Sequence, residues 1–72
     1  MAVELSKEEK IQIIESHQRN LAHNKYNLEI DILQENAKSS PSASAVASLQ
    51  LQITEVANQL SALDDELLAV SA

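Results

Sequence analysis

Residues 46–70 read VASLQLQITEVANQLSALDDELLAV. Apolar residues recur there at alternating spacings of three and four, and all eight positions of the repeat are filled. They are Val46, Leu49, Ile53, Val56, Leu60, Leu63, Leu67 and Val70. This spacing aligns side chains along one face of an α-helix, whereas a strand repeats every second residue. The stretch therefore predicts a helix with an apolar heptad seam that the rest of the chain has to cover.

The composition also favours an all-α protein. The 72-residue chain has no Gly, no Cys, one Pro and a single aromatic residue, Tyr26. Tight β-turns depend on glycine and β-sandwich or enzyme cores on aromatic residues, so those folds are disfavoured. Without Cys the chain has neither a disulfide nor a thiolate metal site. Because domains this small are marginal on their own, we expect it to associate with another chain.

The first half of the chain predicts a second helix. Residues Ser6 to Glu9 have the pattern of a capping box, so we expect a helix over residues 6–38 after a frayed segment at 1–5. Five of the eight positions of its best seam are apolar. The eight are Ile11, Ile14, Gln18, Leu21, Lys25, Leu28, Ile32 and Glu35. The long polar side chains on this seam can lay their stems on apolar neighbours while their heads reach water.

A turn is predicted at residues 39–41. Pro41 disfavours helical geometry at Ser40 and fits the first position of a helix over residues 41–70, with Ser40 as its N-cap. A turn this short joins antiparallel helices. The predicted fold is therefore a two-helix antiparallel coiled-coil hairpin that forms one domain.

The two seams match each other in an antiparallel register. If the numbers of facing residues sum to 81, Ile14 meets Leu67, Leu21 meets Leu60, and every a position meets a d position. The centre implied by this register falls at residues 40–41, where the proline lies. The alternative is a parallel dimer or trimer through the second helix, since its seam alone is sufficient for one.

Several apolar residues fall outside the seams. His23, Tyr26, Ile30, Leu33 and Ala37 follow one another at spacings of three and four near the turn, and Leu51 points away from the second seam. This pattern predicts an interface that binds another copy, most simply as a dimer forming a four-helix bundle, or that docks on a larger assembly. The alternative is a set of scattered surface residues, which are common.

Charge is distributed unevenly. The net charge is −6, and all five basic residues precede residue 39. The second half carries only the acidic residues Glu55, Asp64, Asp65 and Glu66. We therefore expect a protein partner and neither nucleic acid nor a membrane. Charged residues at 7–10 stand where a signal peptide would need an apolar core, so secretion by that route is not expected.

No catalytic, metal or cofactor site is predicted. His17 and His23 are six residues apart and point to different sides of a helix, whereas zinc-binding helices space their ligands by four. The acidic run at 64–66 lacks the spacing of a calcium loop. The chain has no glycine-rich phosphate loop, and a two-helix rod offers no cleft for catalysis.

Three stretches carry a resemblance. The chain contains KEEKI at 7–11 and NKYNLEI at 24–30, followed by a Ser-Pro turn and a Leu- and Ala-rich heptad helix. In these it resembles small helical-hairpin proteins of marine cyanobacterial phages. The resemblance implies a viral origin, a location in the host cytoplasm or the virion, and no catalytic residues. The expected function is a non-enzymatic structural or interaction module; the alternative is a small acidic regulator that binds and modulates a host protein.

Overall fold

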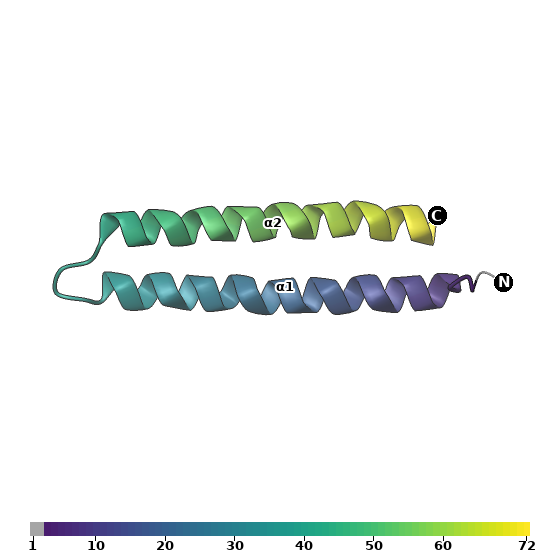
Figure 1. The fold of residues 1–72 in the computed structure, drawn as a ribbon, viewed down its shortest axis with the longest axis horizontal. Coiled ribbons are helices and arrows are strands. Elements are labelled where there is room, and N and C mark those ends of the chain that lie inside the picture. Colours follow the sequence, from purple (N-terminus) through teal and green to yellow (C-terminus); the bar gives the residue numbers. More distant parts are fainter. Residues whose placement is uncertain (1–2) are drawn as a thin grey trace.

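The protein is an antiparallel hairpin of two long helices. The computed structural model describes residues 3–72. It contains two helices, α1 (Lys7–Asn36) and α2 (Ala43–Ser71). The helices lie side by side in a rod of 59 × 21 × 15 Å, with the turn at one end and the start of α1 and the end of α2 at the other (Figure 1). The predicted all-α hairpin is confirmed, and the seam of α2 packs on α1 of the same chain. No helix within residues 3–72 is both long and apolar enough to span a bilayer.

The capping box predicted at the start of α1 is present. The Ser6 hydroxyl accepts a 3.1 Å hydrogen bond from the Glu9 amide, and the Ser6 amide donates a 3.1 Å hydrogen bond to Glu9 Oε1. Two amides that lack intrahelical partners are thereby satisfied, so the helix begins at Lys7. Residues 3–6 precede it without helical structure, and residues 1–2 of the predicted frayed segment lie outside the described residues.

The first helix ends two residues earlier than predicted. α1 stops at Asn36, and Ala37 is its C-cap with right-handed backbone angles of φ −80° and ψ −11°. The Ala37 amide donates to the Leu33 carbonyl at 3.1 Å, and the Lys38 amide donates to the Glu35 carbonyl at 3.2 Å. The second bond spans three residues rather than four, which tightens the last turn and ends the helix before Lys38.

The second helix starts two residues later than predicted. Ser42, not Ser40, is the N-cap, because its hydroxyl accepts a 3.2 Å hydrogen bond from the Ala45 amide. Pro41 therefore precedes the cap instead of occupying the first helical position, and α2 begins at Ala43. The connection runs over residues 37–42, longer than the predicted 39–41. This length lets the chain reverse with no residue of 3–72 at positive φ, as a chain without glycine requires.

The predicted seams contain the least exposed side chains. Ile14 is buried at 8% exposure, and each of the other fifteen seam positions is partly buried. Outside the seams, only Ile30 and Ala45 within residues 3–72 are shielded to this degree. The core is therefore a line of side chains between two helices, open to solvent along both edges.

Hydrogen bonds between the helices agree with the predicted register. Gln18 Nε2 donates to Asp64 Oδ1 at 2.7 Å, so Gln18 lies within one residue of the predicted Leu63. At the open end, Lys7 Nζ donates to the Ser71 carbonyl at 3.0 Å. A lysine at the last turn of α2 complements the negative end of that helix.

Candidate association surface

The side of α1 opposite its seam carries the predicted interface residues of that helix. We define the α1 back face as the outward heptad positions b, c and f from residue 16 to residue 37. Its members are Ser16, Arg19, Asn20, His23, Tyr26, Asn27, Ile30, Leu33, Gln34 and Ala37. All are exposed except Ile30, which is partly buried. Figure 1 shows α1 as a continuous helix along one side of the rod, and the b, c and f positions form a band on the side of α1 that faces away from its seam.

Large apolar side chains on this face remain open to water. Tyr26 is 63% exposed and Leu33 is 64% exposed. Ile30 lies between them in the row, four residues after Tyr26 and three before Leu33, which are the spacings at which helical side chains cover one another. The chain's one aromatic residue and a leucine thus stand outside the only core that the described residues form.

Leu51 does not join this surface. It is 61% exposed and occupies an outward f position on α2. Because the two helices face each other through their a and d positions, their f positions point to opposite sides of the rod. The six residues predicted as one interface are therefore divided into a row of five on α1 and a lone leucine on the far side.

Sequence reasoning missed other exposed apolar residues. Leu68 is 71% exposed and Ile13 is 47% exposed. Each is the neighbour of a seam residue in an Ile-Ile or Leu-Leu pair, and that doubling was the available signal. Ile13 borders a hollow of about 170 Å³ at the open end of the hairpin. The residues around the hollow are Leu5, Lys10, Ile13, Ile14, Glu66 and Val70.

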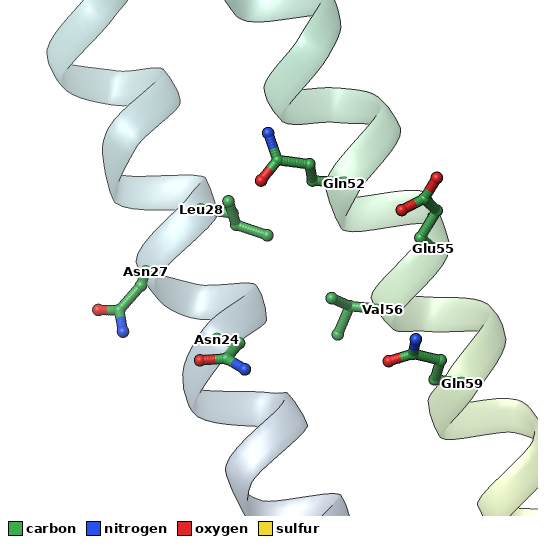
Figure 2. Close-up of a pocket in the computed structure, with 7 residues that line it drawn as sticks. All are labelled: Asn24, Asn27, Leu28, Gln52, Glu55, Val56 and Gln59. Atoms are coloured by element: carbon green, nitrogen blue, oxygen red, sulfur yellow. The ribbon is translucent and has the colours of Figure 1, made fainter.

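A second hollow of about 370 Å³ lies along one edge of the seam, midway along the rod. It is lined by Asn24, Asn27, Leu28, Gln52, Glu55, Val56 and Gln59. In Figure 2, Leu28 and Val56 point toward one another between the helices, while the amides of Gln52 and Gln59 extend toward α1 on either side of them. Amide groups around two aliphatic side chains offer hydrogen bonds but no nucleophile with an adjacent base. The hollow is a solvent-accessible edge of the seam.

The α1 back face carries no carboxylate, although the chain has 11 acidic residues. Its one charged side chain is Arg19, because the other acids and lysines of this part of α1 occupy seam or seam-flanking positions. Lys25 Nζ lies 3.7 Å from the Glu29 carboxylate on one such flank. The outward face of this helix is thus less charged than its flanks, the reverse of what a solvated outer surface requires.

An ion pair closes the turn end of α1. Glu35 is only 12% exposed at its seam position, and its Oε2 lies 2.9 Å from Lys38 Nζ, without the alignment of a hydrogen bond. Lys38 itself is 65% exposed, so the pair is worth about 0–1 kcal/mol.

The residues weighed for metal chemistry are not brought together. Within residues 3–72, no three His, Cys, Asp or Glu side chains gather as a metal site would require. His17 and His23 are both exposed on α1, and Asp64 of the acidic run accepts the hydrogen bond from Gln18. These side chains are accounted for as surface and seam-flanking residues.

Comparisons with known proteins give no relative. Neither a scan against models of protein families, nor a search of curated proteins, nor a search of solved structures found a match to this chain.

Proposed function

We propose that this protein is a non-enzymatic interaction module, a rigid helical hairpin that binds another copy of itself or a larger assembly, such as a virus particle, through the α1 back face near the turn. The observation that carries the proposal is the amount of surface left exposed. The chain exposes 5502 Å², whereas a compact monomer of 7.9 kDa exposes about 4,400 Å². The difference is similar to the area that one partner contributes to a specific protein interface.

The apolar row near the turn is the part of this surface best suited to a partner. Interface centres are enriched in aromatic residues and depleted in charge, and the α1 back face has both properties. Burying a large apolar side chain fully is worth about 1.5–3 kcal/mol, so Tyr26 and Leu33 together offer several kcal/mol. The isolated hairpin does not gain this free energy, because both side chains point away from α2 and stay exposed.

A second candidate function follows from the charge of α2. This helix carries four acidic residues and no basic one. Such a surface attracts a basic partner and raises the rate of encounter with it. The second candidate is therefore a small acidic regulator that uses α2 to approach a basic host protein and modulate its activity.

The proposal is tested by asking whether the α1 back face serves association or the fold. The face variant combines Ile30→Glu with Leu33→Lys. Its matched control combines Asn58→Glu with Ser61→Lys, at the same heptad positions and spacing on the outside of α2. Thermal unfolding of wild type and both variants is followed by circular dichroism at about 1 μM and about 200 μM, because association makes the midpoint depend on concentration.

At the low concentration we expect the face variant to unfold within about 4 °C of the wild type, since Leu33 is exposed and Ile30, although partly buried, lies outside the seams. At the high concentration the midpoints of wild type and control rise, whereas that of the face variant does not. A face variant that is destabilised equally at both concentrations would assign these residues to the fold of the monomer and refute the proposal.

A further inference from the structure

We infer that the partner of the α1 back face is a second copy of this chain, docked antiparallel about a two-fold axis that passes through Ile30. The inference rests on the proposed function and adds to it the occupant, the symmetry and the register of the contact. Three observations lead to it: the symmetry of the apolar row, the absence of acidic residues from the face, and the position of the acidic helix.

The apolar row is self-complementary. Ile30 is the middle residue of the row. His23 and Tyr26 lie seven and four residues before it, and Leu33 and Ala37 lie three and seven residues after it. The spacing is therefore nearly the same when the row is read in the opposite direction. In an antiparallel pair centred on Ile30, that residue meets its own copy, His23 meets Ala37, and Tyr26 packs against Leu33. A two-fold interface requires that residue i contact residue j and that j contact i, and the row satisfies this.

Charge favours a second copy over a basic partner on this face. The chain has a net charge of −6, which opposes self-association in general. The α1 back face has no acidic residue, so two copies can meet there without placing carboxylates against each other. A partner attracted by the net charge would instead be basic, and Arg19 on this face would repel it.

The position of α2 limits the remaining repulsion. In one hairpin, α2 runs along one side of α1 (Figure 1). If α1 packs through its opposite side against α1 of a second copy, the two acidic helices lie on the outer sides of the pair. Pairing through Leu51 would bring the two helices of charge −4 together, which like-charge repulsion opposes. The apolar residues of α1 therefore offer the better contact.

The contact is short. From His23 to Ala37 the helix spans about 21 Å, roughly a third of the rod. An overlap of this length buries on the order of 1,000 Å² in total, the size of a transient interface, for which affinities in the micromolar range or weaker are expected. The four helices lie together only near the two turns, so this is a shorter assembly than a full-length four-helix bundle.

Disulfide trapping tests the register, because the natural chain has no Cys. Single variants Ile30→Cys, His23→Cys and Ala37→Cys are oxidised at about 50 μM in a glutathione buffer, alone and in pairwise mixtures. Two cysteines form a disulfide only when their Cα atoms lie within about 7 Å. In the inferred pair the Cα atoms of residue 30 meet across the axis, whereas residue 23 lies about 21 Å along the helix from its own copy.

We expect Ile30→Cys to form dimers by itself, and His23→Cys to form them with Ala37→Cys but not alone. The mixture should exceed either single variant at least about tenfold, because pairing raises the local thiol concentration toward the millimolar range. Asn58→Cys, outward on α2, is the matched control and should remain monomeric. Adding Ile30→Glu and Leu33→Lys to the His23 and Ala37 cysteine variants should abolish their mixed disulfide.

Three results would overturn the inference. Efficient trapping of His23→Cys with itself indicates a parallel pair, and trapping of Asn58→Cys as efficient as that of Ile30→Cys indicates another surface or random collision. Failure of all the cysteine variants to form dimers, with a wild type that sediments as a monomer at 200 μM, excludes a second copy. The proposed function is judged separately: a monomeric wild type leaves docking on a larger assembly as the role of this face, whereas a face variant destabilised as a monomer refutes the proposed function itself.

Discussion

Gln18 donates a 2.7 Å hydrogen bond from Nε2 to Oδ1 of Asp64, across the seam between α1 and α2. Gln18 is one of three polar residues on the α1 seam, with Lys25 and Glu35, and this bond gives its amide an acceptor on α2. Hydrogen bonds of exposed side chains are worth about 0.5–1.5 kcal/mol. In a double-mutant cycle of Gln18→Ala and Asp64→Ala, we therefore expect a coupling free energy in that range from urea unfolding.

The matched control for this cycle pairs Gln18→Ala with Asp65→Ala, which removes an acidic residue at an outward position. Its coupling should be below about 0.5 kcal/mol, as for sites without shared contacts. Equal coupling in the two cycles would mean that the bond reflects general charge effects. For Gln18→Leu, the gain from filling the seam is offset by the loss of this bond, so the net stabilisation should be smaller than burial of leucine alone predicts.

Core substitutions should follow the gradient of burial along the rod. Ile14 is 8% exposed, so Ile14→Ala should lower the free energy of unfolding by about 2–5 kcal/mol. Leu60 is only partly buried, and Leu60→Ala should cost less, about 1–2 kcal/mol. Urea unfolding at about 1 μM measures both. A larger loss for Leu60→Ala would contradict this order and indicate that a partner covers the middle of the seam.

The capping box should make the start of α1 sensitive to acid. The hydrogen bond from the Ser6 amide, aided by the Ser6 side chain, holds the pKa of the Glu9 carboxyl below its ordinary value. A group whose pKa is lowered by folding stabilises the folded state above its unfolded pKa, about 4.3 for Glu. That contribution should disappear as the pH falls from about 4.3 through the lowered pKa.

Two variants separate this effect from other acid-sensitive groups. Glu9→Gln removes the carboxyl whose pKa the Ser6 amide lowers, and it should flatten the loss of stability below pH about 4.3. Glu8→Gln, a neighbouring first-turn residue outside the capping box, should retain the wild-type pH dependence there. Chemical unfolding from pH 7 to pH 3 provides the comparison, and an unchanged acid profile in Glu9→Gln would exclude the capping box as its source.

The fold was largely predictable because its seams are periodic. Fifteen of the sixteen seam positions are partly buried and Ile14 is buried, even where the sequence has Gln18, Lys25 and Glu35. The heptad spacing of the seam positions is sufficient to predict which side of each helix faces inward. The proline limits where the chain can reverse direction. The helix ends in the turn were misplaced by two residues, since several serines near Pro41 are equivalent as caps until the backbone of the loop is known.

The candidate surface was only partly predictable. The α1 row follows from heptad positions, but its division from Leu51 depends on how the two helices oppose each other. Side-chain hydrogen bonds could not be predicted either, because the heptad spacing does not indicate whether the Gln18 amide binds Asp64 or water. Leu68 and Ile13 were missed because they fall outside both the seams and the α1 row, so neither periodic pattern includes them.

Sedimentation equilibrium of the wild-type chain tests the central claim most directly. Between about 5 and 200 μM, the average mass should rise from that of the 7.9 kDa monomer toward twice that value. The variant with Ile30→Glu and Leu33→Lys should remain at 7.9 kDa over the same range, while the Asn58→Glu, Ser61→Lys control behaves as wild type. A wild type that stays monomeric throughout, or a face variant that associates as strongly as wild type, would contradict self-association through the α1 back face.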